Sequence, residues 1–245
     1  GTDSAGAAVS ESFTWTVNNP KPTGVADSET VSENGSITVL AASGVLTNDS
    51  DPDLDPLTVG AVNGSPAGVG APVAGSAGGL FTVNADGSYT FDSNSDFEDL
   101  QSGETRTTTI TYTVSDVNGG FSTADVTITV TGNNDAPVAT SLADVTTVDN
   151  APLTVNAAAA FSDIDGDTLS YTATGLPTGL SINPATGEIT GTIDKSASQG
   201  GTGGVYSVVV TADDGHGGLT PVTLTITITN PLPTAMDDVN AVVED

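Results

Sequence analysis

Two short acidic runs carry the residues of this sequence that are best suited to chemistry. Each run has three Asp residues separated by single residues: Asp51, Asp53 and Asp55 in one, and Asp163, Asp165 and Asp167 in the other. Alternation by two directs every second side chain to the same side of an extended segment. Like charges held together in this way repel each other unless a cation lies between them. Calcium fits such a site, because it takes about six to eight oxygen ligands, many of them carboxylates.

The acidic runs have one alternative interpretation, and their sequences do not match two known calcium-binding motifs. Asp and Gly favour turns for conformational reasons alone, so each run is also consistent with an ordinary solvated turn. An EF-hand loop needs Glu at its twelfth position. Counting from Asp163, that position is Thr174. The glycine-rich nonapeptide calcium repeat is absent from the sequence as well.

The composition restricts the partners that the chain can have. Its 245 residues include 31 acidic and 3 basic side chains, for a formal net charge of −28. Such a chain repels nucleic acid and anionic membrane surfaces, and it attracts cations. Only 14% of the residues are charged and 36% are hydrophobic, which favours a folded chain. There is no Cys, so metal binding replaces disulfides as the expected means of stiffening.

The sequence has no residue pattern that is typical of a catalytic site. The only histidine, His216, lies in the turn DDGHGG, and zinc sites built from several His or Cys ligands are excluded. No Ser is arranged with a His in a triad pattern. Paired carboxylates can hydrolyse glycosides, but every acidic cluster here falls at a predicted turn or module junction. We therefore predict that the chain is not an enzyme.

The elements that position these residues are almost all strands. Segments such as TTTITYTVSD, ADVTITVTG, VYSVVVTA and PVTLTITITN alternate apolar and polar residues. Turn clusters such as DVNGG, NADGS and DDGHGG separate them. The one helix-like run, Ala157 to Ala160, is too short for a helix and predicts a strand end or a single turn. No run of 18 apolar residues predicts a membrane span.

Two internal repeats define the modules. Asn19-Pro20 in TVNNPKPT recurs as Asn230-Pro231 in TITNPLPT, an offset of 230 − 19 = 211 residues. Inside that period, Gly119-Gly120 recurs as Gly217-Gly218, an offset of 217 − 119 = 98 residues. About 100 residues therefore make one module, which is the size of a Greek-key sandwich.

The fold class predicted from these repeats is all-β, with tandem Greek-key β-sandwich modules of cadherin or Ig type in a linear array. We expect four parts. Residues 1–20 are the C-terminal strands of a truncated preceding module, 21–133 and 134–231 are two complete sandwiches, and 232–245 are the first strand of a following module.

Longer motifs resemble known families. Residues from about 25 to 133 resemble the VCBS-type cadherin-like repeats of very large bacterial adhesins, through ADSETVSENGSITV, VLTNDSDPDLDPLTV and FEDLQSGETRTTTITYTVSDVNGG. Residues from about 136 to 230 look like the dystroglycan-type cadherin-like family, through FSDIDGDTLSYTATGLPTGLSINPATGEITGT and YSVVVTADDGHGG. The resemblance implies surface-anchored or secreted bacterial proteins, whose modules serve as spacers or as binding units.

The resemblance to cadherins implies calcium ligands at the module junctions. In cadherins, ligands come from a Glu in the first strand, an acidic residue before the penultimate strand, the linker, and two loops of the next domain. The residues of this chain at such positions are Glu33, Glu104, Asn134, Asp135, Asp163, Asp165, and Asp213 or Asp214. At the preceding junction they are Asp27, Asp51, Asp53 and Asp116. Thr131 stands where the cadherin linker has its first Asp, which removes one carboxylate.

These features lead to one main functional hypothesis and one alternative. The main hypothesis is that the chain consists of calcium-stiffened extender modules of a bacterial cell-surface or secreted adhesin, of the kind used in biofilms. The alternative is that they are carbohydrate-binding modules of an extracellular polysaccharide-active protein, although aromatic residues make up only 4% of the chain. The expected cofactor is Ca2+, and the expected partners are neighbouring modules of the same chain. Extracellular polysaccharide is a further candidate partner, and we expect a monomer that neither binds nucleic acid nor inserts into membranes.

Overall fold

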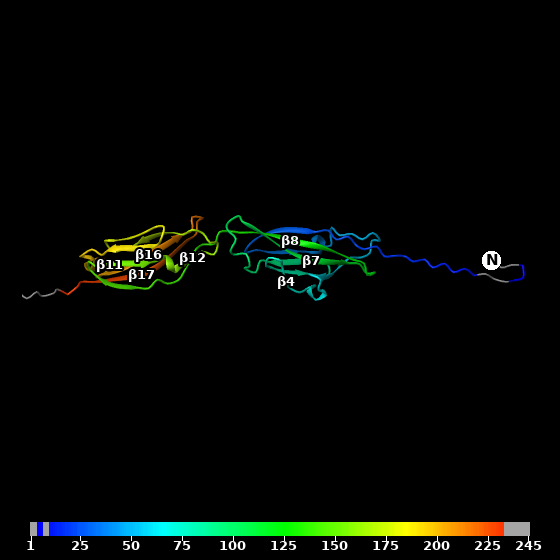
Figure 1. Ribbon diagram of the computed structural model, residues 1–245, viewed down its shortest axis with the longest axis horizontal. Coiled ribbons are helices and arrows are strands. Elements are labelled where there is room, and N and C mark those ends of the chain that lie inside the picture. The colour runs from blue at the N-terminus through cyan, green and yellow to red at the C-terminus, as the bar shows by residue number, and fades with distance from the viewer. Residues whose placement is uncertain (1–3, 7–9, 233–245) are drawn as a thin grey trace, which may run out of the picture. The chain divides into compact units, whose positions relative to one another are not determined.

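The computed structural model of the protein describes residues 4–6 and 10–232, which form two compact units (Figure 1). Unit 1 consists of the residues up to Phe97 together with Thr105–Thr131, and unit 2 consists of Glu98–Glu104 together with the residues from Gly132 onward. The modules predicted over 21–133 and 134–231 differ from these units by two residues at their boundary and in the place of Glu98–Glu104.

Unit 1 is a β-sandwich of two four-stranded sheets. One sheet has the order β1 (Asp27–Ser32), β8 (Phe121–Thr131), β7 (Thr105–Ser115) and β3 (Thr58–Val62). The other has the order β2 (Ser36–Val39), β6 (Tyr89–Asp92), β5 (Leu80–Val83) and β4 (Val73–Ala74). Two short 3-10 helices, η1 (Ala41–Ser43) and η2 (Pro66–Gly68), lie in the connections. β1 pairs with β8 in parallel, whereas β7 and β8 form an antiparallel hairpin.

The hairpin of β7 and β8 follows directly from the sequence alternation. Ile110, Tyr112 and Val114 of β7 are buried, and their neighbours in the sequence are mostly Thr. The two strands pair without a register shift from Thr105 opposite Thr131 to Ser115 opposite Phe121. β-branched residues with one buried and one open face are the pattern that a half-buried sheet favours. The register places the turn DVNGG at the tip of the hairpin, so Asp116 has a fixed position.

The core of unit 1 is aromatic at its centre. The rings of Phe81 and Phe91 have centroids 4.8 Å apart in a tilted arrangement, and Phe91 and Phe97 have centroids 6.5 Å apart. Such tilted pairs add to the stabilisation that burial of the rings already gives. The hydroxyl of Tyr112, which is fully buried, donates toward the Val45 carbonyl at 2.9 Å. This contact anchors the connection that leads into the acidic run of unit 1.

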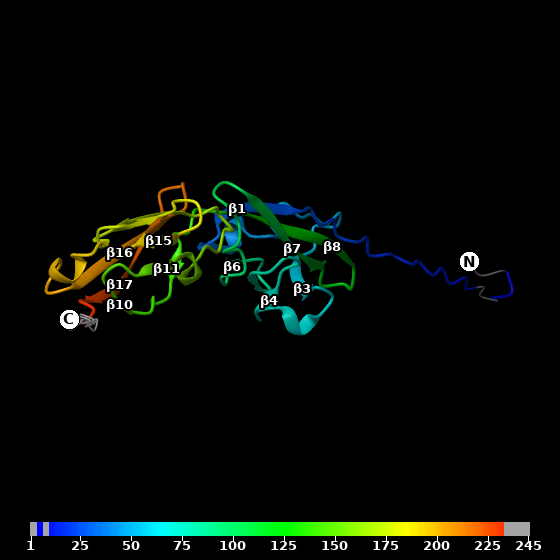
Figure 2. The same cartoon turned by 60° about the vertical axis from the view of Figure 1, so that its left-hand side comes forward.

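Unit 2 repeats the same architecture with a four-stranded and a three-stranded sheet (Figure 2). Its main sheet has the order β10 (Val145–Val148), β17 (Leu219–Thr229), β16 (Val205–Asp213) and β13 (Ser170–Thr174). The opposing sheet has the order β11 (Pro152–Asn156), β15 (Glu188–Thr192) and β14 (Leu180–Ile182). The short strands β9 (Val138–Ala139) and β12 (Phe161–Ser162) pair with each other. As in unit 1, the first long strand, β10, joins the last strand in parallel.

The core of unit 2 is aliphatic, with Ile189, Val208, Leu224 and Ile226 at its centre. The alanine run predicted as a strand end or a single turn forms one turn of 3-10 helix, η3 (Ala158–Ala160). A second such turn, η4 (Ala197–Gln199), precedes β16. The prediction of an all-β fold built from sandwich modules is therefore confirmed.

The segments at the two ends of the chain are the ones predicted to belong to a preceding and a following module. Residues 10–20 contain no strand, and Phe13, Trp15 and Val17 are each at least 80% exposed. The strand predicted over 232–245 lies almost entirely outside the described residues. Among the described residues, no helix has the length and apolar character that crossing a membrane requires.

Candidate metal centre

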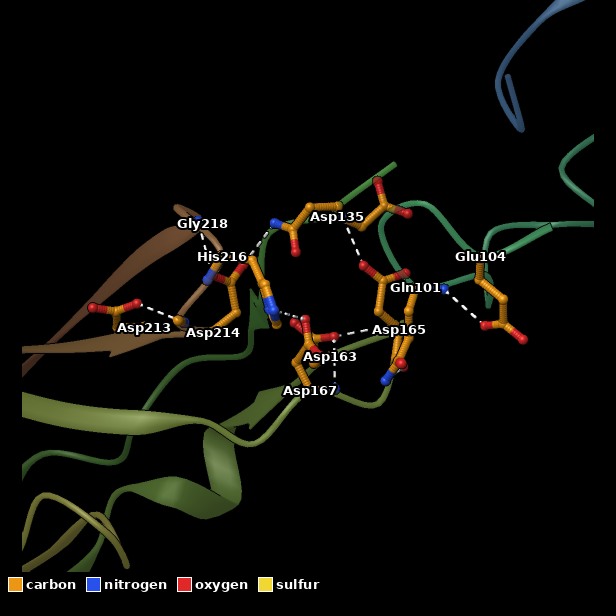
Figure 3. A network of polar contacts seen from close by, with 12 residues as sticks. Gln101, Glu104, Asp135, Asp163, Asp165, Asp167, Asp213, Asp214, His216 and Gly218 are labelled. Carbon is orange, nitrogen blue, oxygen red and sulfur yellow. Dashed lines mark hydrogen bonds and ion pairs between the residues drawn. The ribbon is translucent and has the colours of Figure 1, made fainter. Parts of the chain in front are cut away.

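The acidic run of unit 2 is folded into a tight loop after β12. The carboxylate of Asp163 accepts hydrogen bonds at Oδ1 from the backbone N–H groups of Asp165 (3.0 Å) and Asp167 (3.3 Å). One carboxylate oxygen from each of these three Asp residues lies within 4.8 Å of the others (Figure 3). The loop therefore gathers three negative charges in a small volume, which is unfavourable without a compensating cation.

The linker, which includes Asn134 and Asp135, is hydrogen-bonded to two loops of unit 2. The backbone N–H of Asp135 donates to Asp165 Oδ2 at 2.9 Å. The side-chain amide of Asn134 donates to Asp214 Oδ2, also at 2.9 Å. Because these contacts fix both residues, the Asp135 carboxylate is held beside the acidic loop. Burial, followed by the charges of Asp165 and Asp163, raises the pKa of Asp135 above its ordinary value.

The turn between β16 and β17 presents Asp214. Its Oδ1 accepts from the backbone N–H groups of His216 (2.7 Å) and Gly218 (2.9 Å). The amide of Asn134, and then these backbone donors, hold the pKa of Asp214 below its ordinary value even though the residue is buried. Gly218 is required here, because a Cβ at this position would collide with the Asp214 carboxylate and with Ala136.

The segment Glu98–Glu104 supplies a further carboxylate to unit 2. The side-chain amide of Gln101 donates to the backbone carbonyl of Asp165 at 3.4 Å (Figure 3). Burial raises the pKa of Glu98, and the nearby charges of Asp135 and Asp165 raise it further. Glu98 therefore belongs to the same electrostatic cluster as the linker and the acidic loop. Its neighbours Phe97 and Leu100 are both fully buried, so the backbone that carries Glu98 is anchored.

Five side-chain oxygens of this cluster are buried and have no hydrogen-bond partner among the described residues. They are Glu98 Oε1, Asn134 Oδ1, Asp135 Oδ2, Asp163 Oδ2 and Asp165 Oδ1. An unsatisfied buried polar atom costs free energy, and the cost is larger for a charged group. All five atoms are hard oxygen donors of the kind that calcium takes. The residues present therefore fit a calcium ion.

Two other predicted ligands of unit 2 are engaged in their own turns. The exposed side chain of Glu104 accepts at Oε2 from the backbone N–H of Gln101 at 3.3 Å. Asp213 Oδ1 accepts from the backbone N–H of Gly215 at 2.8 Å. Of the pair Asp213 and Asp214, the structure joins only Asp214 to the linker by a hydrogen bond.

Unit 1 contains a loop with the same internal hydrogen bonds. Asp51 Oδ1 accepts from the backbone N–H groups of Asp53 (2.8 Å) and Asp55 (3.3 Å). Asp116 in the β7–β8 turn accepts at Oδ2 from the side-chain amide of Asn19 at 2.7 Å. Asp51 is only 6% exposed, and its Oδ2 is buried without a hydrogen-bond partner among the described residues. Asp51, Asp53 and Asp116 thus occupy places equivalent to those of the unit 2 loops.

The remaining predicted residues of unit 1 lie elsewhere in that unit. Asp27 Oδ2 lies 3.2 Å from the hydroxyl of Tyr112, and its Oδ1 accepts from Asn48 at 3.1 Å. Burial raises the pKa of Asp27, the Tyr112 hydrogen bond opposes this, and the charge of Asp49 adds to it. Glu33 follows β1, is fully buried, and donates its backbone N–H to the Thr131 carbonyl at 2.9 Å.

The sequence prediction missed Glu98. The available signal was the spacing of Phe97 and Leu100, because two buried anchors around an acidic residue hold its carboxylate in one place. A stretch with several acidic residues, FEDLQSGE, gave no other reason to prefer Glu98 over Glu104.

The fold and the loops define a tandem β-sandwich protein with acidic, oxygen-rich loops. Residues 18–132 match the family described as "Bacterial cadherin-like domain", and residues 136–229 match the family described as "Putative Ig domain". Domains of these types are typical of extracellular adhesion or extender modules and are typically non-catalytic. The finer VCBS-type and dystroglycan-type assignment stays a prediction.

Solved structures to which the chain shows some likeness include cadherin ectodomains. Protocadherin gamma B7 domains 1–4 share 15% identity over 86% of this chain and 51% of that chain, with a TM-score of 0.47. The human desmocollin-1 ectodomain shares 14% identity over 87% of this chain and 41% of that chain, with a TM-score of 0.43. An endo-fucoidan hydrolase of glycoside hydrolase family 107 shares 18% identity over 90% of this chain and 30% of that chain, with a TM-score of 0.34.

The chain thus spans about half or less of each of these solved chains. No curated protein matches the sequence. All three identities are below 25% and all three TM-scores are below 0.5. The family matches cover two segments, residues 18–132 and 136–229, and each covers less than half of the chain.

Proposed function

We propose that the acidic cluster of unit 2 binds calcium, and that the loaded units serve as stiff extender modules of a bacterial surface or secreted adhesin. The observation that carries the proposal is the set of five buried oxygens without hydrogen-bond partners among the described residues. A cation would satisfy them all at once, whereas water would leave the carboxylates to repel each other.

Six residues would hold the ion. Five of them carry the unpartnered oxygens, and the sixth is Asp214: Glu98, Asn134, Asp135, Asp163, Asp165 and Asp214. Carboxylates and an amide carbonyl supply the hard ligands that calcium prefers. Magnesium demands near-octahedral geometry with shorter bonds and keeps its waters, so a cluster drawn from four separate segments suits it less well. Calcium when bound would neutralise the charges that raise the pKa of Asp135 and Glu98.

The mechanical part of the proposal rests on connectivity. The segment Glu98–Glu104 continues at both ends into residues of unit 1, while its Glu98 belongs to the acidic cluster of unit 2. An ion shared by Glu98, Asp135 and the acidic loop would hold this segment, the linker and the loop together within unit 2. Extracellular modules can bind calcium at roughly 0.1–1 mM. We therefore expect the ion to be bound outside a cell and to restrict bending between the units.

The same ion would stabilise the fold. A ligand that binds only the native state adds about 2.7 kcal/mol when it is present at 100 times its Kd. In domains of about 100 residues this raises the melting temperature by several degrees. We expect a higher melting temperature in millimolar calcium than in chelator, and a smaller rise in magnesium. Identical melting curves in all three buffers would refute calcium binding.

Small-angle X-ray scattering separates the stiffening role from calcium binding alone. In calcium, we expect the two-unit chain to have one narrow distribution of maximum dimensions, and in chelator a wider distribution. Circular dichroism in both buffers establishes that the units stay folded. Coincident scattering profiles, with folded units and a calcium-dependent melting temperature, would refute stiffening and leave calcium binding in place.

A further inference from the structure

The segment that precedes unit 1 carries an exposed apolar stripe, which consists of Phe13, Trp15 and Val17. These side chains are 80%, 89% and 91% exposed, and they alternate with threonines as the residues of a half-buried strand do. Residues 10–20 nevertheless form no strand. Single exposed apolar side chains are ordinary, whereas a contiguous apolar row is typical of an interaction surface. The stripe is therefore a surface whose partner has to be identified.

The last strand of unit 2 has the same pattern in the same register. At the 211-residue offset of the internal repeat, the stripe corresponds to Leu224, Ile226 and Ile228 of β17 (224 − 13 = 211). The threonines between them correspond as well. In unit 2, the three apolar side chains are at most 2% exposed and belong to the hydrophobic core. The same pattern is thus buried in one place and exposed in the other.

The position of β17 indicates what such a strand contacts. It lies between β10, with which it pairs in parallel, and β16, with which it pairs in the antiparallel direction. Tyr206 of β16 is directly opposite Ile226, and Val208 is opposite Leu224. A strand in this position makes backbone hydrogen bonds on both sides and turns its apolar face to the core. The stripe therefore fits a sandwich with an open place between its first and its penultimate strand.

A hydrogen bond of the linker supports this position independently. In unit 2, the side-chain amide of Asn134 donates to Asp214 Oδ2 at 2.9 Å. Asn134 follows the last strand of the preceding unit closely, because β8 ends at Thr131. In unit 1, the side-chain amide of Asn19 donates to Asp116 Oδ2 at 2.7 Å in the corresponding hairpin turn. The residues just before Asn19 thus hold the place in the chain that a last strand holds before Asn134.

The two units of a second copy are poorer partners for the stripe. In unit 2 the corresponding place is filled by β17, and in unit 1 it is filled by β8, which lies between β1 and β7. The residues after the strand decide which of the two types the stripe belongs to. Asn19-Pro20 matches Asn230-Pro231 after β17, whereas β8 is followed by Gly132-Asn133. The match therefore favours a sandwich of the unit 2 type.

We propose that residues 10–18 are the last strand of a sandwich of the unit 2 type, and that the body of this sandwich is the partner of the apolar stripe. A strand like β10 would lie on one side and a strand like β16 on the other. Trp15 and Phe13 are larger than Ile226 and Leu224, so the partner needs more room in its core than unit 2 has. The inference goes beyond the proposed function and does not rest on calcium binding.

The test supplies such a body to the chain. Residues 8–245 are lengthened at the N-terminus by a second copy of residues 134–218, so that Gly218 of the added copy precedes Ala8 as it precedes Leu219 in unit 2. The added body has no β17 of its own. Trp15 is the only Trp of the chain, so its fluorescence reports on the stripe alone. We expect its emission to shift to shorter wavelengths, and amide exchange of residues 10–18 to slow by about a hundredfold or more, as in a core strand.

Two further versions of the lengthened chain allow for the larger side chains. Tyr206→Ala in the added body makes room for the indole, because Tyr206 is opposite Ile226, the residue that Trp15 replaces. In this roomier chain, Phe13→Asp with Val17→Asp should abolish both signals, since it places charges at core positions and keeps Trp15 as the reporter.

Three outcomes would overturn the proposal. The first is emission and amide exchange that stay as in the original chain, both with and without Tyr206→Ala. The second is protection that survives the two Asp substitutions. The third is a shift of Trp15 emission in the original chain when its concentration is raised, because this would assign the stripe to a second copy.

Discussion

The acidic loops of units 1 and 2 have the same frame of internal hydrogen bonds, but the residues that surround the two loops differ. In both units, the first Asp of the triplet accepts two backbone hydrogen bonds, and the Asp of the hairpin turn accepts one from an Asn side chain. In unit 2, five buried oxygens lack partners among the described residues, whereas at the loop of unit 1 only Asp51 Oδ2 does.

The difference lies in the residues that accompany the loop. One residue after the Asn that contacts the hairpin turn, unit 2 has Asp135 and unit 1 has Pro20. Asp135 adds a carboxylate to the cluster, and its backbone N–H donates to Asp165. A proline has neither a carboxylate side chain nor a backbone N–H. Unit 2 also has Glu98. The two loops therefore share one frame, and the residues brought to it from other segments set how many carboxylates and unpartnered oxygens lie around it.

The largest expected effect is the loss of calcium binding in unit 2. Asp163→Ala with Asp165→Ala should remove most of the calcium-dependent stabilisation, which is about 2.7 kcal/mol at 100 times Kd. The matched change in unit 1, Asp51→Ala with Asp53→Ala, should remove less. Asp86→Ala is a control, because Asp86 is exposed and accepts only from Ser88. Calcium titration by calorimetry measures all three, and equal losses would indicate a diffuse acidic surface.

A change at Glu98 should have opposite effects in the two buffers. Glu98→Gln keeps the shape of the side chain and removes a charge that faces Asp135 and Asp165. In chelator the variant should melt at a higher temperature than wild type, since repulsion is relieved. In calcium it should bind more weakly, by several-fold to about tenfold, because a carboxylate ligand is lost. Glu104→Gln, the matched control, should change neither value, and a variant at Glu98 that melts lower in both buffers would contradict the cluster.

A gain of affinity should follow when unit 1 receives the residue of unit 2. Pro20→Asp supplies the carboxylate and the N–H that Asp135 provides in unit 2. The calcium affinity of unit 1 should rise by about threefold to tenfold, since each added carboxylate increases the charge of the site. Pro20→Ala restores the N–H without the charge and should give a smaller gain. Equal calcium affinity in Pro20→Asp and Pro20→Ala would contradict the role given to the Asp135 carboxylate in the difference between the two units.

The smallest expected effect is a pH dependence in metal-free buffer. Glu98 and Asp135 have raised pKa values in the folded state, so the native protein binds more protons than the unfolded chain between their ordinary and raised values. Their contribution to stability is present at low pH and is lost as the pH rises through the raised values. The melting temperature should therefore fall as the pH rises from about 4, near the ordinary values of Asp and Glu, toward neutral pH.

The variant that carries Glu98→Gln and Asp135→Asn identifies the source of this pH dependence. Without the two titrating groups, the slope of melting temperature against pH should be smaller than in wild type. An unchanged slope would assign the effect to the overall charge of the chain.

The fold could be predicted from sequence because its signals are local. Alternation in segments such as TTTITYTVSD sets which side chains face the core, and the 98-residue offset that relates Gly119-Gly120 to Gly217-Gly218 matches two equivalent hairpin turns. The triplets were visible for the same reason, since both loops close through hydrogen bonds between neighbours in the sequence.

The composition of the candidate site depends on contacts between distant residues, which the sequence does not display. Glu98 and Asp165 are 67 residues apart (165 − 98), and their proximity follows from packing of Phe97 and Leu100 and from the Gln101 hydrogen bond. Asp213 and Asp214 are adjacent, and only the strand register separates the one that contacts Asn134 from the one that contacts Gly215. Sequence reasoning therefore found the loops but not which carboxylates join them.

The most direct measurement of the central claim is equilibrium dialysis of the full chain against radioactive calcium. The account predicts at least one ion bound per chain at millimolar free calcium, and its loss in the variant with Asp163→Ala and Asp165→Ala. Absence of bound calcium in wild type, or undiminished binding in that variant, would contradict the assignment of the unit 2 cluster as a calcium site.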